Sequence, residues 1–116
     1  MTSDTTTRRI VHCDVFAPRI GTGNPLAVIL DSQGLTADQM QAIAHWTNLA
    51  ETTFILPPTH PDADYRVRIF TTRKEIAFAG HPSIGSAHVL IDAGLQSKQA
   101  GVILQIILAV QLVDHL

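Results

Sequence analysis

The 116-residue sequence has one cysteine, one tryptophan and one tyrosine, and it has no block of like charge. A lone Cys13 forms neither an intramolecular disulfide nor a thiolate metal cluster, which favours a reducing compartment. Eight Lys and Arg against ten Asp and Glu leave a net charge of −2. The composition therefore argues against a surface that binds nucleic acid or another polyanion.

The sequence also lacks a hydrophobic run long enough to span a bilayer. Its most apolar segment, 100–113, is interrupted by Gln105 and Gln111 and is shorter than the ~20 residues that a transmembrane helix needs. Residues 1–9 are polar and lack the apolar region of a secretory signal, so we expect a polar N-terminal tail and a cytoplasmic location. Hydrophobic residues make up 46% of the chain and charged residues 16%, which indicates one globular domain.

Several short segments combine β-branched and apolar residues with Gly or Pro at their ends. They predict strands at 10–16, 26–31, 51–56 and 65–71, a short extended segment at 75–79, and a strand within the apolar tail, 101–116. The glycine-rich loop 21–25 would join the first two strands as an antiparallel hairpin. Alternation in 65–71 places Arg66 and Arg68 on one face, which we expect to be solvated.

Two segments have the signals of helices. Thr36 and Gln39 match the capping box, which predicts a helix that ends near Asn48. Its apolar stripe is expected to contain Met40, Ile43, Ala44 and Thr47, widened by Ala37 and Trp46. A second helix is predicted over 83–93, with Gly94 just past its end. The buried side of this second helix is expected to contain Ile84, Gly85, Ala87 and Ile91. Strands and short helices in this order favour an α+β fold.

Glu51 is the first candidate for chemistry, because it stands between a predicted helix and an apolar strand. Desolvation among Leu49, Phe54 and Ile55 would disfavour its ionised form, a property that suits a general acid or base. The alternative is a surface glutamate at the end of a strand.

The second candidate is the turn at 79–83, in which Gly80 permits close backbone approach and His81 precedes the predicted helix. A helix start has free N–H groups and binds anions, so a substrate carboxylate could rest there beside His81. The alternative is that Gly80 and Pro82 only shape a turn, with His81 solvated.

Other signals are weaker. The loop 21–25 lacks the third glycine of a dinucleotide fingerprint, and His81 with His88 gives too few ligands for a metal, so we expect neither a cofactor nor a metal site. Arg66 and Arg68 could clamp a carboxylate, although a solvated strand face is the more ordinary explanation. Cys13 is expected to be a buried core thiol.

Several motifs together resemble the amino-terminal half of the phenazine-biosynthesis PhzF-like proteins, in the family's order and spacing. The matching motifs are GNPLAV at 23–28, LT at 35–36 with QMQAIA at 39–44, NLAETTF at 48–54, YRVRIFT at 65–71 and FAGHPSIGSA at 78–87. The likeness covers about residues 10–94.

This resemblance implies one half of a diaminopimelate-epimerase-like fold, a curved mixed or antiparallel sheet around a central helix. It implies a cofactor-independent isomerase in which Glu51 is the acid/base glutamate acting on a small carboxylate. Substrate binding is then expected at four residues: Asn24, Gly80, His81 and Ser83. Ala79 stands where related epimerases carry a cysteine base, which argues against a two-thiol racemase.

The chain also departs from the family pattern. We expect residues 10–116 to form a single half-domain whose tail, 95–116, diverges from the family, and the second half of the family's chains is absent. Two hypotheses follow. One is an isomerase completed by a second copy or a complementary half, and the other is a catalytically incomplete or non-enzymatic, self-associating half-domain.

A half-domain that ordinarily abuts a partner would have exposed apolar surface and open strand edges, both of which favour association. We therefore expect the chain to form a dimer or larger aggregates. Light scattering at high protein concentration measures this directly, and a monodisperse monomer would contradict the expectation.

Overall fold

The computed structural model describes residues 7–15, 19, 21–77, 79–96, 98 and 105–107. Its elements follow in the order β1 (Ile10–Val15), β2 (Asn24–Ile29), α1 (Ala37–Thr47), β3 (Glu51–Leu56), β4 (Tyr65–Phe70), β5 (Glu75–Ile76), α2 (Gly80–Asp92) and β6 (Gln105–Ile107). The strands fall within the predicted segments, apart from the start of β2. Only β6 of the predicted tail strand lies among the described residues.

The strands form one mixed sheet in the order β1-β2-β3-β4-β5, and β6 pairs in parallel with the first half of β4. The predicted hairpin is confirmed, because β1 and β2 pair antiparallel from Ile10 opposite Ile29 to Val15 opposite Asn24. The neighbouring strands β2 and β3 are parallel, and α1 is the connection between them. Two parallel pairs, β2–β3 and β4–β6, beside three antiparallel pairs leave the predicted α+β class intact.

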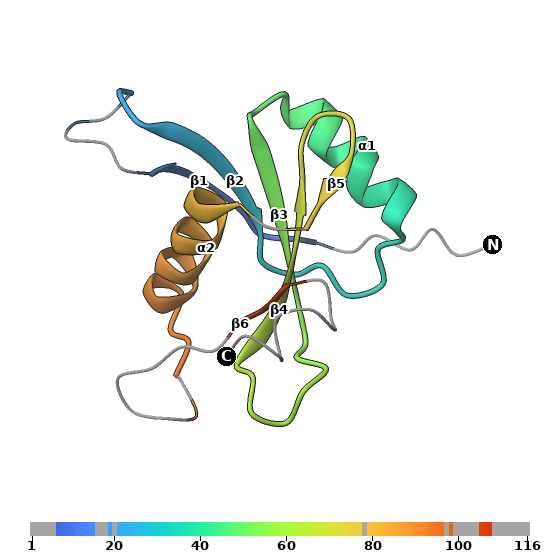
Figure 1. Ribbon diagram of the computed structural model, residues 1–116, viewed down its shortest axis with the longest axis vertical. Coiled ribbons are helices and arrows are strands. Elements are labelled where there is room, and N and C mark those ends of the chain that lie inside the picture. The colour runs from blue at the N-terminus through green and yellow to red at the C-terminus, as the bar shows by residue number, and fades with distance from the viewer. Residues whose placement is uncertain are drawn as a thin grey trace.

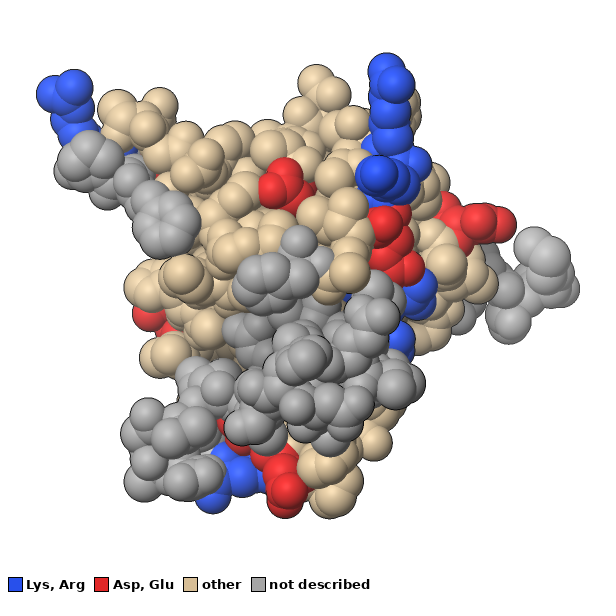
Figure 2. Space-filling view, viewed as in Figure 1, with Lys and Arg blue, Asp and Glu red and all other residues tan. Residues whose placement is uncertain are grey.

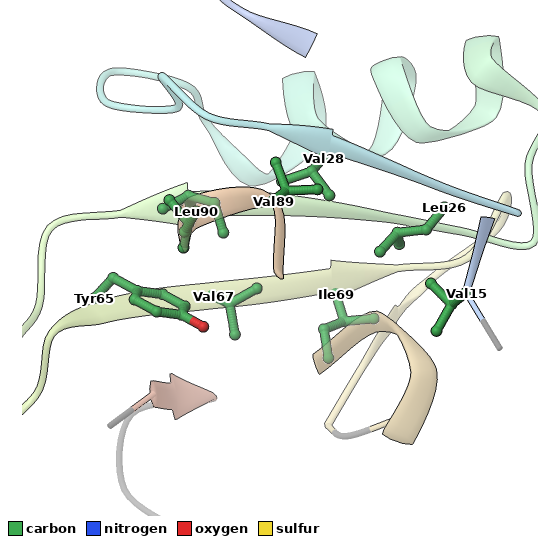
Figure 3. Packing of buried hydrophobic residues seen from close by; sticks show 9 residues of the cluster. Val15, Leu26, Val28, Tyr65, Val67, Ile69, Val89 and Leu90 are labelled. Carbon is green, nitrogen blue, oxygen red and sulfur yellow. The ribbon is translucent and has the colours of Figure 1, made fainter. Parts of the chain in front are cut away.

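The two helices cover opposite faces of the sheet (Figure 1). The layer under α2 contains alternate residues of the strands, among them Leu26, Val28 and Ile55, together with Val89 and Leu90 of the helix. Figure 3 shows these strand and helix side chains meeting in one apolar layer.

The layer under α1 is smaller. Met40 and Ala44 of the helix pack there against Ile29, Phe54 and Phe70. The two phenylalanine rings meet edge to face, with centroids 5.3 Å apart. Because side chains alternate across a strand, the strand residues directly before and after Ile29, Phe54 and Phe70 face α2.

The helix α1 has the predicted ends. The Thr36 hydroxyl accepts from the Gln39 N–H at 3.1 Å, and the Gln39 side chain accepts from the Thr36 N–H at 2.9 Å. Asn48 closes the helix in the left-handed conformation, with φ 58°. The predicted stripe is confirmed for Met40 and Ala44, which are buried, but it is wrong for Ala37 and Trp46, which are exposed, Trp46 to 77%.

The helix α2 differs from its prediction in both start and orientation. It begins at Gly80, three residues early, so that the predicted turn is its first turn. Ile84 and Ile91 are 54% and 53% exposed, whereas Gly85 and Ser86 are buried. Small residues face the sheet here because the helix lies so close to it: a Cβ at Gly85 would stand 2.6 Å from Leu26 Cδ2 and 2.7 Å from Val15 Cγ2.

The predicted solvated face of β4 is also wrong. Phe70 is buried on that face, and Arg68 donates two hydrogen bonds to the Glu75 carboxylate, at 2.8 and 2.7 Å. These bonds raise the pKa of the Arg68 guanidinium. The carboxylate that Arg68 binds is thus that of Glu75, in the chain's own β5.

Another ion pair joins the segment before β1 to the segment after β2. Arg9 donates to the Asp31 carboxylate at 2.8 and 2.9 Å, and these hydrogen bonds lower the pKa of Asp31 to about 2. On the face presented in Figure 2, the Lys and Arg side chains are scattered, several of them beside Asp or Glu, and they form no single basic patch.

The close approach at Gly85 generates a stability prediction. Gly85→Ala should lower the free energy of unfolding, because overpacking costs about 1 to 3 kcal/mol and exceeds the gain in helix propensity of up to about 1 kcal/mol. Gly80→Ala is the matched control, since a Cβ there meets no atom within 4 Å. Urea unfolding of both variants measures the difference, and equal stabilities would contradict close packing at Gly85.

Candidate functional site

Glu51 is the first residue of β3, and its side chain lies on the α2 face of the sheet. Alternation puts it on the same face as Ile55, which belongs to the layer under α2. Its Cα partner on β2 is Leu26, and its side chain is 15% exposed. The expectation that Phe54 helps to desolvate it is wrong, because Phe54 points to the opposite face, under α1.

His81 lies next to Glu51, although 30 positions separate them in the sequence. It is the second residue of α2, and its Nε2 is 3.3 Å from Glu51 Oε1. The imidazole side chain is 17% exposed, so the pair is shielded from water on most sides. The structure therefore brings the two candidates of the sequence into one site.

The Glu51–His81 contact is close without being a well-aligned hydrogen bond. Nε2 of His81 is a buried atom, and among the described residues it has no hydrogen-bond partner of acceptable geometry. A buried polar atom in this condition is costly unless another group satisfies it. The imidazole thus retains hydrogen-bonding capacity for a third group that enters the site.

The start of α2 contributes backbone polarity at the same place. No side chain caps the helix at Ala79, and Pro82 has no N–H. The partial positive charge of this end favours an anionic group beside His81. A side chain at Gly80 would meet nothing within 4 Å, which shows that the space over the first turn is open.

The remaining predicted binding residues are placed differently. Ser83 is buried, and its hydroxyl donates to the Ala79 carbonyl at 2.9 Å within its own first turn. Asn24 is exposed at the start of β2, two residues before Leu26, and therefore lies at the same end of the sheet and on the same face as Glu51. Asn24 and Glu51 share this end of the sheet without a hydrogen bond between them.

An open hollow of ≈ 310 Å³ adjoins this end of the sheet. Two of its lining residues flank the candidate site, because Leu26 pairs with Glu51 and Leu49 precedes it by two positions. The complete lining is His12, Cys13, Asp14, Gly21, Gly23, Pro25, Leu26 and Leu49. A second hollow of ≈ 360 Å³ lies where β2 and β3 end, and it contains none of the predicted site residues.

Sequence reasoning missed a hydroxyl pair behind the site. Thr53 Oγ1 and Ser86 Oγ are 2.8 Å apart, and both residues are fully buried between β3 and α2. Thr53 and Ser86 are each one of several polar residues in their segments, and no local pattern singles them out.

Two further predictions concern residues outside the site. Cys13 is half-buried against the layer under α2, and burial raises the pKa of its thiol. His88 is exposed and lies 3.3 Å from Asp92 on the outer side of α2.

Within the described part of the chain, no group of three or more His, Cys, Asp or Glu is arranged to hold a metal ion. A membrane-crossing helix is likewise not found among the described helices, the longer of which has 13 residues.

Comparison with known proteins gives a consistent result. The model of the family described as "Phenazine biosynthesis-like protein" (PhzC-PhzF) matches residues 13–108. A trans-2,3-dihydro-3-hydroxyanthranilate isomerase from Pseudomonas aeruginosa is 46% identical over 71% of this chain and 29% of its own length. Antisense-enhancing sequence 1 of Schizosaccharomyces pombe is 52% identical over 70% of this chain and 27% of its own.

Comparison with solved structures points to the same family. A PhzF-family protein from Bacillus anthracis superimposes with a TM-score of 0.70 at 36% identity, over 78% of this chain and 30% of that chain. A predicted epimerase from Pseudomonas aeruginosa gives 0.69 at 43% identity, over 76% and 31%. The resemblance and the fold class inferred from the sequence are confirmed, and the chain spans less than a third of each of these relatives.

The burial of the Glu51–His81 pair can be tested against a matched pair in the same helix. We expect Glu51→Gln and His81→Gln to be coupled by on the order of 1 kcal/mol in a double-mutant cycle of urea unfolding at pH 5.5. His88→Gln and Asp92→Asn should couple by only a few tenths of a kcal/mol, because their side chains are 67% and 72% exposed at the same 3.3 Å separation. Equal coupling in the two cycles would show that burial does not strengthen the Glu51 pair.

Proposed function

Since this chain belongs to the phenazine biosynthesis-like family, we propose that it forms part of a cofactor-independent isomerase in which Glu51 transfers a proton on a small carboxylate substrate. The observation that carries the proposal is the contact between Glu51 and His81 at the uncapped start of α2. One relative is named for the isomerisation of a cyclic amino carboxylate, which is the class of substrate that this site would accept.

Each group has a distinct part in the proposed reaction. The substrate carboxylate rests on the partial positive charge at the start of α2. The Glu51 carboxylate accepts a proton from one carbon, the resulting carboxyl group exchanges its proton with water, and it then donates a proton to another position of the same molecule, so that atoms and charge balance. His81 donates a hydrogen bond from Nε2, either to Glu51 or to the substrate, and orients the carboxylate for transfer.

A second candidate function rests on the length of the chain. The chain spans 29% of the isomerase and 30% of the Bacillus anthracis structure. The space over Gly80 at the first turn of α2 is open, and a working site needs walls that exclude water. The chain would then be a catalytically incomplete fragment or a non-enzymatic half-domain that associates with itself.

Deuterium exchange separates the two candidates. The wild-type chain is incubated in D₂O with trans-2,3-dihydro-3-hydroxyanthranilate, and deuterium in the recovered compound is measured by mass spectrometry. We expect incorporation, and we expect Glu51→Gln to slow it at least about 100-fold, the usual contribution of a general acid or base.

The control for this experiment is Asp62→Asn, which removes an exposed carboxylate between β3 and β4 and should leave the rate unchanged. Equal exchange by the wild-type and Glu51→Gln chains would exclude Glu51 as the proton carrier. Absence of exchange in the wild-type chain would favour the incomplete half-domain.

A further inference from the structure

The buried hydroxyl pair between β3 and α2 stands directly behind the Glu51–His81 contact. Thr53 follows Glu51 by two residues on the same face of β3, and Ser86 follows His81 by five residues on α2. These spacings correspond to ~6.6 Å along a strand and ~7.5 Å along a helix. The two contacts are therefore neighbouring cross-links between one strand and one helix.

The environment of the hydroxyl pair is otherwise apolar. Thr53 and Ser86 are both 0% exposed, and Ile55 and Val89 of the layer under α2 lie close by along the same elements. A valine and an alanine would fill nearly the same space without any need for a hydrogen bond, whereas buried hydroxyls are costly unless they are paired. Their 2.8 Å contact satisfies this need.

A hydrogen bond constrains the helix in a way that apolar packing does not. Apolar burial is non-directional, so it does not by itself prescribe one angle between a helix side chain and its partner on the sheet. The hydroxyl contact requires a defined distance and angle. Gly85 sets how closely α2 approaches β1 and β2, and the neighbouring Ser86 sets how far the helix is rotated and shifted along β3.

The contact at the site cannot supply this alignment itself. Nε2 of His81 is 3.3 Å from Glu51 Oε1 but makes no hydrogen bond of acceptable geometry, and α2 has no side-chain cap. Contacts further along the helix can align its first turn, and Thr53–Ser86 is a polar contact of this kind that reaches β3.

We propose that Thr53 and Ser86 are positioning residues that hold His81 in register with Glu51 for proton transfer. This role rests on the proposed function of the Glu51 site. The two residues touch neither the substrate nor the reacting atoms in this arrangement; they act through the placement of the first turn of α2.

The chain offers a matched control on the other side of β3. Thr52 Oγ1 lies 2.8 Å from Thr47 Oγ1 at the end of α1, and Thr52 is also fully buried. Thr52→Val therefore removes a comparable hydroxyl from the adjacent position of the same strand, but on the face away from Glu51. A loss of general stability would affect Thr52→Val and Thr53→Val alike, whereas a positioning effect would not.

The test uses the full chain and records the imidazole NMR signals of its histidines. Ser86→Ala and Thr53→Val should shift the ring signals of His81 and abolish most of the coupling between Glu51→Gln and His81→Gln. Thr53→Ser keeps the hydroxyl, so the His81 ring signals and the Glu51–His81 coupling energy should both stay at their wild-type values. Thr52→Val should leave His81 unchanged, and His60, in the loop after β3, should not respond to any of these variants.

Unchanged His81 signals in Ser86→Ala would overturn the positioning role, and so would an equal shift in Thr52→Val. Ser86→Ala decides the question by itself if Thr53→Val does not fold, because alanine is well tolerated within a helix. In the deuterium assay, Ser86→Ala should slow exchange at least about tenfold, since small misplacements of reacting groups lower rates strongly. A wild-type chain without exchange would contradict the proposed function alone, whereas unchanged His81 signals would contradict the positioning role alone.

Discussion

The close contact of α2 with the sheet is the constraint on which the rest of this structure depends. Gly85 permits it, because any larger residue at that position would collide with Leu26 and Val15. The same approach buries Ser86 against Thr53 and brings the first turn of the helix to the start of β3. A helix held further away would leave the apolar layer open to water and would separate His81 from Glu51.

The candidate site follows from this packing and from the direction of the chain. β2 and β3 run parallel, so that both begin at the same end of the sheet, where Asn24 and Glu51 stand. α2 also begins at that end, which adds an uncapped helix start to a carboxylate and an imidazole. Membership of the phenazine biosynthesis-like family supports the chemical role proposed for this cluster. The chain spans less than a third of its relatives, which raises the question of which further residues contribute to the site.

Local signals predicted much of the fold correctly. The capping box of Thr36 and Gln39 defined α1 because both of its hydrogen bonds lie within one turn. Alternation predicted the strands because it is a property of consecutive residues. The buried side of α2 was predicted correctly at Gly85 but wrongly at Ile84 and Ile91. Hydrophobicity alone favours the isoleucines, whereas the close approach of the helix places the small residues Gly85 and Ser86 against the sheet.

The sequence by itself determined the positions of the strands, the limits of α1, the weak net charge and the identity of Glu51 and His81 as candidates, because these depend on local hydrogen bonding, residue type and recognisable motifs. Only the tertiary structure decided that Glu51 lies beside His81, that Arg68 is bound by Glu75, and that small residues of α2 face the sheet. These features depend on distances between separate elements of the fold, and such distances are set by how the whole sheet and both helices pack together.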